Sequence, residues 1–213
     1  MRTSKAVPST ERELARHLSG EGPVAGIDEA GRGALAGPVV AGAVVDNWDK
    51  HYAWHDAVRD SKQLSPAERS RLYDCITTDC LSFGVGVVSS QDIDAIGIVA
   101  ATRRAMYEAV AALSVPPGYV LVDWVALPRF GGKHEALPKG DCRCLSIACA
   151  SIVAKVTRDR LMERMDTTHS GYGFARHKGY GTEYHLRELH ARGASPIHRV
   201  SVRPVGLIVR GLV

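Results

Sequence analysis

The chain has 213 residues, 45% of them hydrophobic, which is enough to bury a core without disulfide or metal staples, so one main domain is expected. Lys and Arg total 27 against 23 acidic residues, and the net charge of +4 suits a polyanionic partner without identifying one. No apolar run approaches the ~18 residues of a membrane-spanning helix, and no secretory segment is recognisable. These features argue against a membrane protein and favour a cytoplasmic one.

The five cysteines form an odd set without a CxxC pair. This pattern favours packing thiols in a reducing compartment over a disulfide framework or a structural zinc site. The cysteines are Cys75, Cys80, Cys142, Cys144 and Cys149.

The first 22 residues are polar and end in Gly-Glu-Gly-Pro, which predicts a short helix or frayed arm ahead of a domain at 23–213. Residues 24–28 and 37–46 are β-branched and apolar. The glycines between them predict two strands joined by a tight turn.

A capping Ser, a first-turn Pro and a Glu three residues after the cap predict a helix over 65–77. A strand is expected over 82–89. Asp92 is then expected to cap a long Ala-rich helix that runs to about residue 113.

Residues 119–122 form a short apolar run that predicts a buried strand with Asp123 at its carboxyl end, where open α/β sheets place ligand sites. Apolar residues at three- and four-residue steps predict an amphipathic helix over 142–165, with Asp141 just ahead of it. A shorter helix is expected after Thr182.

Acidic residues stand at three of these element ends. Asp28 and Glu29 are adjacent on a strand and therefore point to opposite faces, so they can share a metal only if the strand ends or twists, or if Glu29 reaches from the rim. On its own, this pair before a glycine turn is equally typical of a solvated loop. Together with Asp123 and Asp141 it predicts a site for Mg²⁺ or Mn²⁺, which prefer oxygen ligands, and hence phosphoryl transfer to water.

Several spaced motifs occur in order along the chain: IDEAGRG at 27–33, AGPVVAGAVV at 36–45, DSKQLS at 60–65, VDW at 122–124, KGD at 139–141, SIACASIVAKVTRD at 146–159, HKGYGT at 177–182 and SPIHR at 195–199. In this ordered set the sequence resembles ribonuclease HII, the type 2 ribonuclease H of bacteria, over the span from Val24 to Pro204.

The resemblance implies a ribonuclease H-like α/β fold: a mixed five-stranded sheet with helices on both faces and a helical carboxyl-terminal portion. It implies that Asp28, Glu29, Asp123 and Asp141 bind two Mn²⁺ or Mg²⁺ ions. The implied enzyme is a monomer that cleaves the RNA strand of RNA/DNA hybrids and nicks duplex DNA 5′ of a single ribonucleotide. Its products carry a 3′ hydroxyl and a 5′ phosphate.

Substrate selection needs a reader of the ribose 2′ hydroxyl, and the backbone of Gly31, Arg32 and Gly33 suits that role because glycines permit close approach. The resemblance implies that this tripeptide and Tyr180 recognise the ribonucleotide–DNA junction, Tyr180 by stacking on the next sugar. The bland alternative for Tyr180 is a half-buried aromatic residue with a wet hydroxyl. Further phosphate contacts are expected from Lys62, Lys155, Arg158 and Lys178, whereas Ser61, Ser146 and Ser151 bind phosphate or cap helices.

Three positions depart from the family pattern: Trp124 where Gly is frequent, Gly97 where Asn is frequent, and Gln63 where Lys is frequent. Trp124 raises a question about the backbone after Asp123. His198 is expected to be structural, because nothing pairs it with a nucleophile.

Other assignments fit less well. A ribonuclease HIII is expected to have Lys in place of Arg32, Glu in place of Asp141 and a larger amino-terminal domain. This sequence differs from that pattern in all three respects. A non-catalytic nucleic-acid binder has no need of four acidic groups, which repel phosphate. The glycine spacing at 31–37 is wrong for a dinucleotide site, and no sliding-clamp motif is recognisable in 202–213.

Overall fold

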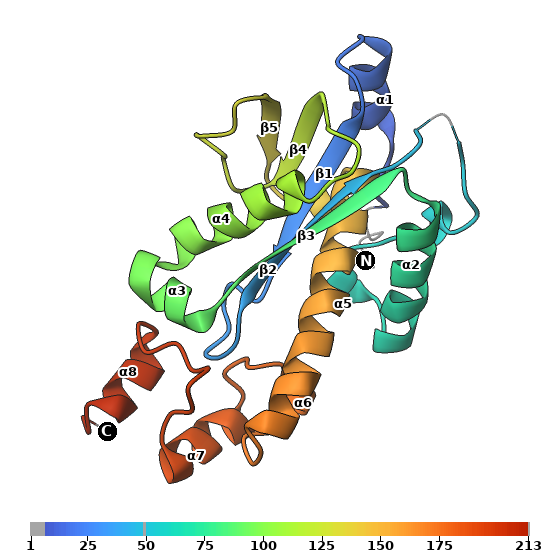
Figure 1. Cartoon of the computed structure of the whole chain (residues 1–213). Helices are drawn as coiled ribbons and strands as arrows, with labels where there is room; N and C mark the ends of the chain where they lie inside the picture. Colours follow the sequence, from blue (N-terminus) through green and yellow to red (C-terminus); the bar gives the residue numbers. More distant parts are fainter. Residues whose placement is uncertain (1–6, 49, 213) are drawn as a thin grey trace, which may run out of the picture.

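The computed structural model describes residues 7–48 and 50–212 and contains one five-stranded sheet in the order β3-β2-β1-β4-β5 (Figure 1). β1 pairs antiparallel with β2, and β2 with β3, whereas β1–β4 and β4–β5 are parallel. The expected mixed sheet is therefore confirmed. The strands are β1 Val24–Ala30, β2 Val39–Val45, β3 Ser82–Val88, β4 Tyr119–Asp123 and β5 Lys133–Leu137.

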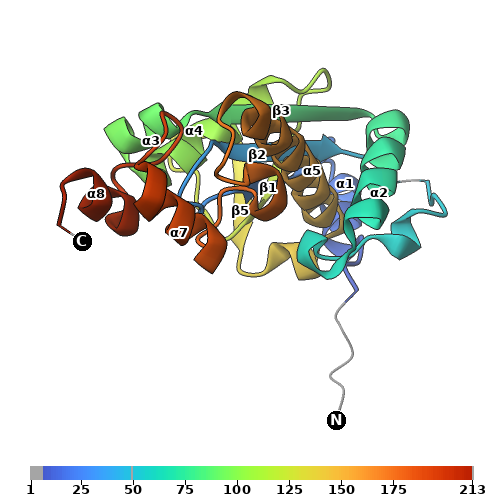
Figure 2. The ribbon, with the colours of Figure 1, turned by 90° about the horizontal axis from the view of Figure 1, so that it is seen from below.

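Helices cover both faces of the sheet, with α4 on one side and α5 and α2 on the other (Figure 1). The shorter helices α6, α7 and α8 gather beyond the end of the sheet that lies opposite α1 (Figures 1 and 2). None of the described helices is long and apolar enough to cross a membrane. The helices are α1 Glu11–Leu18, α2 Pro66–Asp79, α3 Ser90–Ile96, α4 Ile98–Ala111, α5 Leu145–Thr168, α6 Phe174–His177, α7 Glu183–Arg192 and α8 Arg203–Val209, with 3₁₀ turns η1 His55–Ala57, η2 Ser61–Gln63 and η3 Gly140–Cys142.

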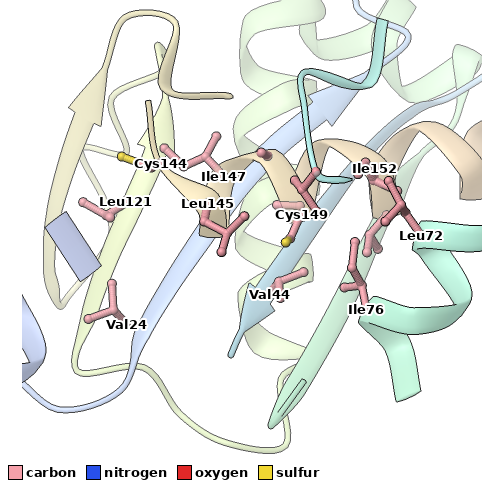
Figure 3. Close-up of a cluster of buried hydrophobic side chains, with 14 of the residues drawn as sticks. Val24, Val44, Leu72, Ile76, Leu121, Cys144, Leu145, Ile147, Cys149 and Ile152 are labelled. Carbon is pink, nitrogen blue, oxygen red and sulfur yellow. The ribbon is translucent and has the colours of Figure 1, made fainter. Parts of the chain in front are cut away.

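The long helix α5 lies directly on β1 and β2, and this close approach requires small residues in the strands. A Cβ at Gly26 would overlap the α5 backbone at Ser146, and one at Gly42 would lie 2.6 Å from the Ala150 carbonyl oxygen. Buried side chains of α5, α2 and the sheet pack together on this face, as Figure 3 shows. This close packing of α5 on the sheet supports the strands β1 and β4 that carry Asp28, Glu29 and Asp123.

The amino-terminal segment contains a helix that packs on the domain. Glu13 of α1 is fully buried, and its carboxylate accepts a hydrogen bond from the Ser146 backbone N–H at 2.8 Å. Burial raises the pKa of Glu13, although hydrogen bonds from Ser146 oppose the shift. Arg12 and Arg16 add ion pairs to Glu135 on β5.

Two expectations about helices were wrong. The helix expected over 92–113 is broken at Gly97, whose φ of +81° lies outside the helical region, so it becomes α3 and α4. Its cap is Ser89, which accepts from the backbone N–H of Asp92, so Asp92 lies inside the first turn. The helix expected from 142 begins at Leu145, because the preceding residues form η3.

One expectation about strands also needs correction, and one strand was not predicted. β1 continues to Ala30 and β2 begins only at Val39, so residues 31–38 form a loop and not a tight turn. The edge strand β5 has the sequence KHEAL, which has no alternation of polar and apolar residues to mark it.

Candidate active site

The parallel pairing of β1 with β4 brings two distant acids together. Ile27 pairs with Val122, so the next residues on each strand, Asp28 and Asp123, lie side by side at the carboxyl ends. The turn η3 adds the third acid, because the Gly140 backbone N–H donates to Asp123 Oδ1 at 2.6 Å and Asp141 follows directly.

Glu29 completes a carboxylate cluster that we define as Asp28, Glu29, Asp123 and Asp141. β1 does not end at Asp28, so its two acids leave on different sides of the strand. Glu29 reaches from the rim: its side chain is partly exposed and lies 3.8 Å from Arg32. The negative charge of Asp123 nevertheless acts on both Asp28 and Glu29.

Mutual repulsion and burial dominate the electrostatics of the cluster. Burial and the charges of Glu29 and Asp123 raise the pKa of Asp28 well above its ordinary value, against a hydrogen bond from Ser151. Burial also raises the pKa of Glu29, with Arg32 opposing, and that of Asp123, with the Gly140 N–H opposing. The cluster is therefore a site that needs compensating positive charge.

Lys62 supplies part of that charge. Its ammonium nitrogen lies 4.0 Å from Asp141 Oδ2 while the side chain remains mostly exposed. Partial burial lowers the pKa of Lys62, but the charges of Asp60, Asp141, Asp28 and Asp123 outweigh this and raise it. One ammonium group cannot neutralise so many carboxylates.

Two neighbours of Asp141 were missed from the sequence. Asp60, Asp141 and Cys142 offer ligand atoms that all lie within 4.8 Å of one another. The signal for Asp60 was present, because it opens the DSKQLS motif, but its side chain could equally cap η2, where it does accept from the Lys62 backbone N–H. Cys142, expected to be a packing thiol, stands beside the acids.

The donor set suits a hard divalent cation. The ligand atoms of the cluster are carboxylate oxygens, which Mg²⁺ and Mn²⁺ prefer. One of them, Glu29 Oε2, is buried without a hydrogen-bond partner. A buried carboxylate oxygen is costly unless a cation or a donor satisfies it, so the residues present fit a metal.

Most of the predicted substrate-binding residues line one cavity of about 280 Å³ that adjoins Glu29. We call it the GRG cavity. Ser61 and Ser151 form its floor, with their hydroxyl oxygens 2.9 Å apart. The predicted residues that line it are Gly31, Arg32, Gly33, Lys62, Ser151, Lys155 and Tyr180.

Three predicted phosphate contacts are not in this cavity. Lys178 lines a neighbouring cavity instead, where its ammonium nitrogen lies 2.6 Å from Glu163 Oε1. Ser146 is fully buried beneath α1 with its backbone bound to Glu13, so its hydroxyl has no route to a substrate. Arg158 is also fully buried, and its guanidinium donates to the carbonyls of Ala36, Pro38 and Lys178 at 3.2, 2.9 and 2.9 Å. Arg158 is therefore structural, and the expectation that it contacts phosphate was wrong.

Arg158 joins the two segments that carry the cavity walls. It ties the loop after Gly33 to the segment before Tyr180, and the Gly179 carbonyl accepts from the backbone N–H groups of Leu35 and Ala36. A second buried arginine, Arg199, donates to the carbonyls of Gly37 and Arg32. Its role was missed because nothing near it in sequence reveals its partners.

His198 is structural, as expected. It is buried, and its Nδ1 accepts from the Ser195 backbone N–H at 2.9 Å while Nε2 lies 3.0 Å from His185 Nε2. Burial and the neighbouring His185 lower the pKa of His198 to about 4.

Positive φ angles at non-glycine residues border the site. Within residues 7–48 and 50–212 they occur at Trp124, Lys139 and Lys178, with φ of +52°, +56° and +54°. Trp124 follows Asp123, Lys139 precedes η3, and Lys178 lies near Tyr180. The first explains why glycine is frequent there in the family pattern: the backbone after Asp123 is left-handed.

Comparisons with known proteins agree on one family. The family model described as Ribonuclease HII matches residues 25–204. Ribonuclease HII of Dehalococcoides mccartyi is 48% identical over 205 residues, covering 96% of this chain and 97% of the relative. That of Chloroflexus aurantiacus is 50% identical over 200 residues, covering 92% and 93%.

A solved structure gives the same answer. The ribonuclease H2 of Pyrococcus horikoshii OT3 superposes with a TM-score of 0.75 at 26% identity, covering 89% of this chain and 98% of that one. Sequence, fold and carboxylate cluster therefore lead to one conclusion: the chain belongs to the ribonuclease HII family and is a type 2 ribonuclease H.

Proposed function

We propose that this nuclease cleaves the RNA strand of RNA/DNA hybrids and also nicks duplex DNA on the 5′ side of a single embedded ribonucleotide, leaving 3′ hydroxyl and 5′ phosphate ends. The observation that supports this most is the position of the carboxylate cluster, which shares Glu29 with the GRG cavity. A phosphodiester held by the cluster therefore places its sugar against the backbone of residues 31–33.

Asp28, Glu29, Asp123 and Asp141 would hold two Mg²⁺ or Mn²⁺ ions. Bound ions of this kind supply an activated water and charge stabilisation at the leaving 3′ oxygen. The substrate would bind after the metal ions, because the combined negative charge of the carboxylates repels phosphate until cations are present. Lys62 reduces that charge from the exposed side of Asp141.

The backbone of residues 31–33 would read the 2′ hydroxyl. Gly31 has φ of +89°, which only glycine adopts readily, and it turns the loop at the end of β1. Gly33 is exposed, and a Cβ placed there would meet no atom within 4 Å, so its backbone is open to a ligand. An amide or carbonyl at such a position can approach a ribose closely and bond its hydroxyl.

Tyr180 would stack on the sugar of the deoxynucleotide that follows, where a 2′ hydroxyl would disturb the contact. Its ring is half-buried, and the cationic groups of Lys155 and Arg158 lie 5.7 and 5.3 Å from the ring centroid. These contacts fix the orientation of the ring before substrate binds.

Basic residues extend the binding surface beyond the cavity. A second cavity of about 580 Å³ shares Lys155 and Tyr180 with the first and is also lined by exposed Arg160 and Arg176. Such a path suits the phosphates of a duplex, since phosphate contacts set register and affinity.

The test uses a DNA duplex with one ribonucleotide, incubated with Mg²⁺, with Mn²⁺ and with EDTA. We expect a nick 5′ of the ribonucleotide that needs the divalent ion and is lost in Asp123→Asn, whose amide oxygen can still accept from Gly140. Glu11→Gln, at an exposed acid on α1 that lines neither cavity, is the control and should nick normally. Nicking by Asp123→Asn at the unmodified rate would remove the cluster from the mechanism. Metal-dependent cleavage of a hybrid without any nick in this duplex would refute the single-ribonucleotide activity.

A further inference from the structure

The side chain of Trp124 is unusually exposed for its type. The ring follows Asp123 directly and is 67% exposed, whereas the other two tryptophans, Trp48 and Trp54, are each only 7% exposed and belong to the core. Large aromatic side chains gain most from burial, so an exposed tryptophan beside a predicted metal-binding carboxylate offers apolar area that a bound substrate can cover.

The backbone of Trp124 is held in a conformation that disfavours a bulky residue. Its φ is +52°, and its N–H donates to the Leu137 carbonyl at 3.0 Å, which continues the pairing of Asp123 with Leu137. The sheet therefore imposes the strain, and a glycine would satisfy the same hydrogen bond without it. Strain retained at a functional site, at a residue that adds nothing to the core, indicates a role for the side chain.

A cationic group lies close to the ring. The guanidinium carbon of Arg32 lies 5.6 Å from the ring centroid, a cation–π distance. Arg32 lines the GRG cavity, but Trp124 does not. The tryptophan therefore lies beside Arg32 but outside the cavity that Tyr180 lines.

We propose that Trp124 is a further substrate-binding residue, whose ring packs against a sugar of the bound duplex while Arg32 contacts the adjoining phosphate. The inference rests on the proposed function, because a reader of the 2′ hydroxyl must approach from the minor groove, where these hydroxyls and the sugars are displayed. Trp124 flanks that reader, so its ring faces the same groove. Two aromatic residues, Trp124 and Tyr180, then contact different nucleotides around one scissile phosphate.

Tryptophan fluorescence tests the contact directly, because Trp124 is the accessible member of the three tryptophans. An Asp141→Asn protein prevents cleavage, and the anisotropy of a labelled single-ribonucleotide duplex establishes that it is bound. We expect bound duplex to reduce acrylamide quenching by at least half, and to have no such effect when Trp124→Phe is added. Quenching that stays unchanged with the duplex bound would overturn the proposal.

Kinetics separate a binding role from a structural one. Trp124→Gly should raise KM for the duplex about tenfold with kcat within twofold, and should not lower the melting temperature, because glycine relieves the strain at φ +52°. Trp124→Phe should keep KM within about threefold. A lower melting temperature with unchanged KM would assign Trp124 to the fold and contradict the proposal.

A double variant decides whether the ring acts only by holding Arg32. In an Arg32→Gln background, Trp124→Gly should still raise KM, and no further rise would overturn the sugar contact. If the unmodified protein neither binds nor nicks the duplex, the proposed function fails and this inference with it. If it nicks normally and Trp124→Gly keeps the same KM, only the present inference fails.

Discussion

Replacing the buried Arg158 with methionine tests how the two walls of the GRG cavity are held. The guanidinium donates three hydrogen bonds to backbone carbonyls of Ala36, Pro38 and Lys178, which lie on segments more than 130 residues apart in sequence but meet at α5. Arg158→Met preserves the length of the aliphatic stem and removes every one of these donors. The carbonyls remain, so the variant leaves them buried without partners.

The expected cost follows from these bonds. Each hydrogen bond from a charged donor contributes roughly 1.5–3 kcal/mol, and Arg158 makes three of them. Methionine also removes the cost of burying the guanidinium charge, which offsets part of the loss, so the free energy of unfolding should fall by roughly 3–5 kcal/mol. For a domain of this size that corresponds to a melting temperature lower by roughly 10 °C. Burial also lowers the pKa of Arg158, which is consistent with a charge held by carbonyls and not by a carboxylate.

Urea and thermal unfolding measure the effect, with Arg164→Met as the control because Arg164 is exposed on the same helix. The control should change the free energy of unfolding by less than about 0.5 kcal/mol. Arg158→Met should also raise KM for a hybrid substrate, since Tyr180 loses its support. A stability within about 1 kcal/mol of the unmodified protein would refute the reasoning, because buried orphan carbonyls cannot be that cheap.

Three further predictions concern the loop, the histidine pair and the lysine at the cluster. Gly31→Ala should lower the free energy of unfolding, measured in urea, by at least about 2 kcal/mol, because φ is +89° and the added Cβ would overlap the buried guanidinium of Arg158. Gly33→Ala should keep the free energy of unfolding of the unmodified protein but raise KM, because a Cβ there meets no atom. Equal losses of stability in the two variants would contradict this. The lowered pKa of His198 means that the neutral imidazole favours the folded state, so its contribution to the free energy of unfolding is complete above pH 6.5 and is lost as the pH falls toward 4. By pH 4.5 the unmodified protein should therefore have lost about 2.5 kcal/mol that His198→Asn does not lose. Equal pH dependence of the free energy of unfolding in the two proteins would exclude this role of His198. Lys62→Met should weaken duplex binding and reduce the slope of log affinity against log salt by about one, as anisotropy in a KCl series measures; an unchanged slope would show that Lys62 makes no phosphate contact.

Most helices and strands were predicted from the sequence, because capping residues and apolar spacing lie within the element that they mark. The apolar run at 119–122 predicted a strand that ends in Asp123, and the capping box at Ser65 predicted α2. The convergence of Asp28 with Asp123 is different, because it depends on parallel pairing of strands about 95 residues apart, as the paired Ile27 and Val122 show. No periodicity encodes that pairing, so the sheet order came from the family resemblance.

The failures have equally specific causes. The apolar residues on either side of Gly97 keep helical spacing, and a single glycine is tolerated within a helix, so the break shows only in the φ of +81° at that residue. Lys155 and Arg158 are three residues apart on one face of α5, yet one reaches the cavity and the other is buried, because distant carbonyls converge on the second. Trp124 departs from the family pattern, and its exposure could be known only from the fold.

The central claim is that acids from three separate parts of the chain hold divalent ions together, and Mn²⁺ binding tests it most directly. Titration at pH 7.5, with free Mn²⁺ measured by its paramagnetic resonance signal, should show binding that weakens at least about tenfold in Asp28→Asn and in Asp141→Asn, since even supporting residues of metal sites cost that much. Asp74→Asn should bind as the unmodified protein does. If both cluster variants retained the full affinity for Mn²⁺, the carboxylates would not form a shared metal site, and the proposed mechanism would be wrong.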